Sequence, residues 1–110
     1  MLRPALVLML LAPSAALAQT AEPREACLLA AGGRKIIEGA CLLSPIGEDG
    51  SFQIASPDGA LFAQVLITGE GTGDGYWNGT AGAGHAHDPL GSLRRTGGCW
   101  IGETAILCVW

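Results

Sequence analysis

The densest group of polar side chains in the sequence lies at residues 85–88. His85 and His87 stand two residues apart, so in an extended chain both imidazoles point to the same side. That spacing suits a divalent metal ion, to which Asp88 could add an oxygen ligand or orient a ring. A complete site needs a third or fourth ligand, and histidines in a Gly/Ala-rich loop are usually solvated. We therefore expect no cofactor, with metal binding as the alternative.

Residues for nucleophilic catalysis are scattered. Both histidines lie in one loop, and no serine lies in a turn that would expose it as a nucleophile. The segment 69–75, GEGTGDG, has alternating glycines, whereas a dinucleotide-binding loop has the spacing G-x-G-x-x-G and opens a helix. We interpret 69–75 as a flexible connector. The sequence predicts no enzyme, and a small hydrolase is the second alternative.

Aromatic side chains directly follow this glycine-rich segment. Tyr76 and Trp77 are of the types that dominate binding surfaces, and an arginine pair further along the chain could supply complementary charge. The alternative is that Trp77 belongs to the core. The candidate binding residues are Tyr76, Trp77, Asn78, His85, His87, Arg94 and Arg95.

Four cysteines, at positions 27, 41, 99 and 108, bear on the scaffold. Four cysteines allow three pairings, among which the sequence alone does not choose. Turns near Gly33 and over 102–104 would bring the members of two pairs opposite each other in hairpins. We therefore expect the disulfides Cys27–Cys41 and Cys99–Cys108. The chain has no Cys-x-x-Cys pair, which disfavours a zinc site.

The first eighteen residues have the organisation of a secretory signal peptide. A short basic start, 1–3, precedes the apolar run ALVLMLLA at 5–12, and Ala16-Leu17-Ala18 is a small-x-small cleavage site. The run is too short to span a bilayer. Since no cysteine stands at the cleavage point to carry a lipid, we expect cleavage before Gln19 and no membrane anchor. The predicted location is the periplasm or the medium.

Composition sets limits on the partner. Removing eighteen residues from a chain of 110 leaves enough for one domain with a modest core. The formal net charge of −4 becomes more negative by one when Arg3 is removed. The few basic side chains form no phosphate-binding surface, so we expect no nucleic-acid partner. The acidic balance favours encounter with a basic partner.

Short apolar runs separated by turn residues predict an all-β fold. We expect a disordered leader at 19–25 and a single β domain over 26–110. The run 60–68 is apolar on both faces and could instead be a short helix. The segment 80–91 shows no periodicity and is expected to be a surface loop. Strands are expected at 27–30, 35–43, 51–55, 60–68, 93–101 and 105–110. The expected architecture is a small, disulfide-stapled antiparallel meander that forms a sandwich or a partly open barrel.

The C-terminal third carries a distinctive pattern: His85-x-His87, Leu90-Gly91-x-Leu93-x-Arg95, Cys99-Trp100 and Ile106-x-Cys108-x-Trp110. This pattern resembles small secreted proteins of Gram-negative bacteria that are known only as uncharacterised. The resemblance implies periplasmic export and no particular activity. A looser resemblance, in size, export signal, cysteines and the segment 76–79, is to periplasmic inhibitors of c-type lysozyme, which are disulfide-bonded β-barrels. Their Ser-Gly-x-x-Tyr type of motif is absent from this sequence.

The sequence thus predicts an exported, monomeric, disulfide-bonded protein that binds another protein or an envelope component. Inhibition of a basic extracytoplasmic protein such as lysozyme is one specific form of that prediction. The alternatives are divalent-metal binding through His85, His87 and Asp88, and hydrolysis.

Overall fold

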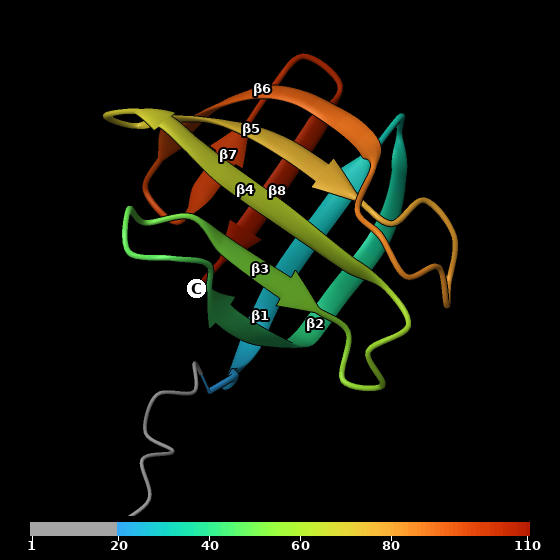
Figure 1. The fold of residues 1–110 in the computed structure, drawn as a ribbon. Helices are drawn as coiled ribbons and strands as arrows, with labels where there is room; N and C mark the ends of the chain where they lie inside the picture. The colour runs from blue at the N-terminus through green and yellow to red at the C-terminus, as the bar shows by residue number, and fades with distance from the viewer. Residues whose placement is uncertain (1–19) are drawn as a thin grey trace, which may run out of the picture.

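The computed structural model describes residues 20–110. The expected signal peptide at 1–18 lies outside this range. The described part of the chain forms a closed barrel of antiparallel strands in chain order (Figure 1). The strands are β1 (Glu22–Ala31), β2 (Arg34–Pro45), β3 (Phe52–Ala55), β4 (Phe62–Gly69), β5 (Thr72–Trp77), β6 (Asp88–Thr96), β7 (Cys99–Ile101) and β8 (Ala105–Val109).

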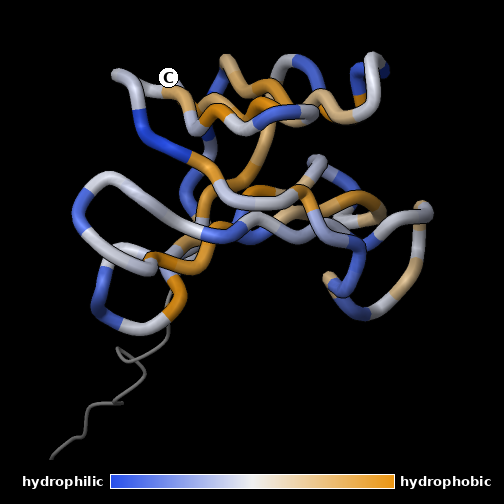
Figure 2. Tube along the Cα trace, turned by 90° about the horizontal axis from the view of Figure 1, so that it is seen from above, coloured by the Kyte–Doolittle hydropathy of each residue, from blue (hydrophilic) through white to orange (hydrophobic). Residues whose placement is uncertain are grey.

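The predicted antiparallel meander is confirmed, and pairing of β8 with β1 closes it into a barrel. The strand form of the run 60–68 is also confirmed, as β4. Residues 20–110 contain no helix of the length and hydropathy that a bilayer crossing requires. Figure 2 shows hydrophilic residues in the loops that extend from the barrel.

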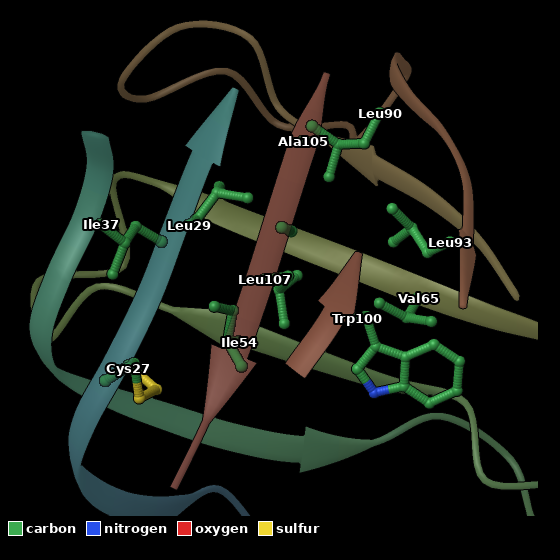
Figure 3. Close-up of a cluster of buried hydrophobic side chains, with 12 residues drawn as sticks. Cys27, Leu29, Ile37, Ile54, Val65, Leu90, Leu93, Trp100, Ala105 and Leu107 are labelled. Atoms are coloured by element: carbon green, nitrogen blue, oxygen red, sulfur yellow. A yellow bond between two sulfur atoms is a disulfide. The ribbon is translucent and has the colours of Figure 1, made fainter. Parts of the chain in front are cut away.

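The core fills the inside of the barrel. Alternate residues of each strand face inward, and Leu29, Ile54, Val65 and Leu107 are fully buried there. Figure 3 shows these side chains together, contributed by β1, β3, β4 and β8. Because strands all around the barrel contribute aliphatic side chains to one core, the strands are held together, and the loops at both ends of the barrel start from fixed positions.

Both predicted disulfides are present, Cys27–Cys41 and Cys99–Cys108. Cys99 and Cys108 are direct cross-strand partners of β7 and β8, with Cα atoms 4.0 Å apart. Cys27 instead pairs with Gly39 in the β1–β2 register, next to an irregularity between Arg24 and Cys27. The Cα atoms of Cys27 and Cys41 are consequently 6.0 Å apart, within the range that a disulfide spans.

The prediction of a disordered leader is wrong for residues 22–25. The strand β1 begins at Glu22, and Glu22, Pro23 and Arg24 pair with the end of β2. Strand β2 is long, twelve residues, and offers backbone partners beyond the apolar part of β1. Backbone pairing therefore extends β1 through a polar stretch that has no hydrophobic period.

The interpretation of 69–75 as a flexible connector is also wrong, because 72–75 belong to β5. Gly73 and Gly75 are buried and lie where a side chain would enter the core. A Cβ on Gly75 would lie 2.7 Å from Leu93 Cδ1, and one on Gly73 would lie 2.9 Å from Val65 Cγ1. Glycine at these positions makes room for the large side chains of β4 and β6.

Replacing Gly75 by alanine is expected to lower the free energy of unfolding by about 1–3 kcal/mol, because the added methyl group overpacks the core. Urea denaturation followed by circular dichroism measures this loss. Gly84→Ala is the matched control, since no atom lies within 4 Å of the Cβ position there and its φ is not positive. Equal midpoints for the two variants would contradict the packing role of Gly75.

The C-terminal strands differ from the predicted ones. Strand β6 begins at Asp88, inside the expected loop 80–91, and buries Leu90 and Leu93. The expected strand 93–101 is broken by a turn at Gly97, where φ is 62°, so its last part is β7. This turn brings Arg95 opposite Trp100 as cross-strand partners.

Candidate functional site

The predicted binding residues do not form one cluster. In the β5–β6 ladder Trp77 pairs with Asp88, whereas Thr72 pairs with Arg94. The two pairs are five residues apart along β5, a distance of ~17 Å in an extended strand. Tyr76 and Trp77 therefore lie toward one end of the barrel, and Arg94 and Arg95 toward the other.

Asn78 is a structural residue rather than a binding residue. Its side chain is buried, with 2% of the residue exposed. Its Oδ1 accepts a hydrogen bond from the Phe62 amide at 3.1 Å. Its Nδ2, which has two hydrogens to donate, lies within hydrogen-bond distance of the carbonyl oxygens of Ala60, Thr80 and Ala83, at 2.8–3.1 Å. These bonds tie the β5–β6 connection to the β3–β4 turn, so Asn78 is not available to a partner.

The remaining residues at that end have varied environments. Trp77 is half-buried and packs against the core, which is the alternative that the sequence left open. Tyr76 is half-buried, and His85 and His87 are exposed in the loop between β5 and β6. Across residues 20–110, no three His, Cys, Asp or Glu side chains come together as they would around a metal ion.

The opposite end of the barrel opens into a cavity of about 610 Å³, here called the barrel mouth. Its walls come from the start of β1, the end of β2, the β2–β3 loop, the β6–β7 turn and the end of β8. The side chains that define its chemistry are Glu22, Arg24, Glu48, Phe52, Arg95 and Trp100. Of these, only Arg95 was a predicted site residue.

The floor of the barrel mouth is aromatic. The rings of Phe52 and Trp100 have centroids 6.0 Å apart and planes inclined by 51°. Such a tilted arrangement is favourable for two aromatic rings and holds both in place. Trp100 is 8% exposed, and Figure 3 shows it in the same cluster as Ile54 and Val65. Leu43 and Val109 add apolar walls.

The rim of the barrel mouth carries charges of both signs. Arg24 Nη2 donates to Glu22 Oε1 at 3.2 Å, so these two charges are paired. Arg95 lies on the inner face with its cross-strand partner Trp100, and its Nε donates to the Gly97 carbonyl oxygen at 3.1 Å. That bond orients the guanidinium. Within residues 20–110 its terminal nitrogens have no protein partner.

The β2–β3 loop, which carries Glu48, is held in a defined shape. The Ser51 amide donates to Asp49 Oδ1 at 2.9 Å, and this bond lowers the pKa of the Asp49 carboxyl below its ordinary value. Ser51 Oγ accepts a hydrogen bond from the Ile67 amide at 2.9 Å, which anchors the loop to β4. The backbone of the loop is thus fixed, while Glu48 has no ion-pair partner among the described residues.

The sequence contains one local signal for this site. Arg95 and Trp100 flank Gly97-Gly98, and a tight turn at two glycines places the flanking residues opposite each other. Phe52 and Glu48 come from a distant part of the chain and reach the mouth only through barrel closure. Comparison of the chain with protein-family models, with curated proteins and with solved structures gives no match.

Proposed function

We propose that this chain is an exported binding protein, periplasmic or secreted, and that the barrel mouth is its ligand site. The observation that supports this most is the combination of an aromatic floor with oriented charge in a cavity of about 610 Å³. Ligand sites are mostly apolar cavities of roughly 300–1,000 Å³ with a few placed polar groups. The two disulfides are consistent with an exported protein.

Binding fits the mouth better than catalysis does. Of its charged side chains, Arg24 and Glu22 are paired, which leaves Arg95 and Glu48 among the described residues. General acid–base or nucleophilic chemistry needs two or more groups within hydrogen-bond reach of one reacting atom. Among the described residues of the mouth, no histidine, thiol or free serine is available for such a set.

Inhibition of a basic protein such as lysozyme is a finer form of this proposal. The net negative charge of the chain supports encounter with such a partner. A protein partner would place one side chain in the barrel mouth, whereas a small envelope component would enter it whole. The experiment below tests both kinds of ligand. We propose that the binding unit is a monomer.

A thermal-shift screen of small envelope components against the exported protein tests the location of the site. Ligands of the mouth are expected to bind Phe52→Leu at least tenfold more weakly, because the variant removes one of the two rings of the aromatic floor. Binding to Trp77→Phe, a variant at the other end of the barrel, is expected to be unchanged. A ligand or a lysozyme whose binding depends on Trp77 and not on Phe52 would place the site at the other end.

A further inference from the structure

Among residues 20–110, the charged side chains of the barrel mouth comprise one ion pair and two groups without an ion-pair partner. Arg24 and Glu22 are bonded to each other at 3.2 Å. Arg95 is held at Nε by the Gly97 carbonyl oxygen, and its terminal nitrogens are without a protein partner in the described range. Glu48, on the anchored β2–β3 loop, likewise has no ion-pair partner in that range. Within the described part of the chain, the mouth therefore offers one free cation, Arg95, and one free anion, Glu48.

These two groups lie on opposite sides of the mouth. Arg95 stands beside the β6–β7 turn, and Glu48 stands in the β2–β3 loop. The two connections are four strands apart in a closed barrel of eight, so they face each other across its axis. Both side chains line the same cavity, with the rings of Phe52 and Trp100 beneath them.

From this arrangement we infer that the barrel mouth takes a small zwitterion with an apolar side chain, of the aromatic amino acid class. This inference rests on the proposed function. The carboxylate of the ligand accepts hydrogen bonds from the free guanidinium nitrogens of Arg95, which present two donors side by side. The ammonium group donates to Glu48. The apolar side chain enters the mouth and covers Phe52 and Trp100.

Other ligand classes match these groups less well. An uncharged apolar ligand would remove water from Arg95 and Glu48 without replacing those hydrogen bonds, which is unfavourable. A ligand with a single charge would pair with one of these two groups and leave the other without water and without a hydrogen-bond partner. An anion with several charges, such as a phosphorylated compound, would also lie beside Glu22 and Glu48. A zwitterion satisfies both groups and adds no net charge.

Calorimetry with three ligands tests the inference. The ligands are L-phenylalanine, L-phenylalaninamide, which has no carboxylate, and N-acetyl-L-phenylalanine, which has no ammonium group. We expect L-phenylalanine to bind the exported protein at least tenfold more tightly than either derivative, because each lost charge-assisted hydrogen bond costs about that factor.

Two variants assign the charges to their partners. Arg95→Gln is expected to weaken L-phenylalanine about tenfold and to abolish its preference over the amide. Glu48→Gln is expected to abolish the preference over the N-acetyl derivative. Arg94→Gln and Glu103→Gln, both exposed and outside the mouth, are the matched controls and should leave all three affinities unchanged. The exposed positions 48 and 95 allow both site variants to fold.

The outcomes separate this inference from the proposed function. Equal affinities for the three ligands, all weakened by Phe52→Leu, would overturn the zwitterion and leave the site in place. If none of the three ligands binds but another compound binds in a Phe52-dependent manner, the zwitterion is likewise overturned and the site is kept. If no ligand or partner responds to Phe52→Leu or Arg95→Gln, the proposed site itself is wrong.

Discussion

Replacement of Asn78 by alanine is expected to lower the free energy of unfolding by about 2–4 kcal/mol. The side chain bonds one amide and lies within hydrogen-bond distance of three carbonyl oxygens, and it is buried. Alanine would leave the Phe62 amide and the carbonyl groups without this partner, and an unsatisfied buried group costs about 1–3 kcal/mol. Urea denaturation at neutral pH measures the change.

Gln64→Ala is the control for this prediction. Gln64 Nε2 donates to Gln53 Oε1 at 2.9 Å, a single side-chain bond in a half-buried position, and its loss should cost no more than about 1 kcal/mol. If Asn78→Ala unfolds at an unchanged midpoint but no longer binds a partner, the structural role of Asn78 is contradicted and Asn78 is a binding residue. Asn78→Asp keeps the acceptor for the Phe62 amide but loses the donor, so it should also be destabilised.

Removal of the Cys27–Cys41 disulfide, by Cys27→Ala with Cys41→Ala, is expected to cost about 3 kcal/mol. The bridge closes a loop with a sequence separation of 14, which restricts the unfolded chain. Both cysteines are also buried, so the double variant loses packing in the core. For a domain with about 5–15 kcal/mol of total stability this is a large fraction. Equilibrium unfolding without reductant measures the effect.

The second disulfide provides the comparison. Cys99 and Cys108 have a sequence separation of 9, so the chain-entropy contribution is smaller, about 2–3 kcal/mol. We therefore expect the Cys27/Cys41 variant to have the lower unfolding midpoint. The reverse order would show that the β7–β8 hairpin contributes more to the stability of the barrel than β1 and β2 do.

The local parts of the fold follow directly from the sequence. Ser56-Pro57-Asp58-Gly59 has the composition of a turn, because proline presets its own φ and glycine accepts a positive φ. In the structure Gly59 has a φ of 76°, and the Ala60 amide donates to Asp58 Oδ1 at 3.0 Å. That bond and one from the Ser56 hydroxyl lower the pKa of Asp58 below its ordinary value. Both disulfide pairings could also be predicted, because each connects the two strands of one hairpin.

The remaining features depend on contacts between distant segments. Gly73 and Gly75 indicate a loop by composition, and only the side chains of Val65, Leu90 and Leu93 explain why a strand needs them. The barrel mouth also depends on contacts between segments that are far apart in the chain. Its floor joins Phe52 to Trp100, which are 48 positions apart in the chain. The Gly97-Gly98 turn indicates only that Arg95 lies opposite Trp100, and nothing near Phe52 in the sequence indicates a ligand site. Local pattern therefore predicted the strands better than the site.

The pairing of β1 with β8 has a consequence for assembly. Over residues 20–110, every other ladder joins strands that are consecutive in the chain, and such hairpins form within microseconds. Closure instead has to wait for both terminal strands, and the formation of long-range pairs is slow. Until then the bare edge of β1 can pair with other chains and start aggregation. The edge stays open until β8 pairs with it, so the yield of folded protein depends on how quickly β8 reaches β1.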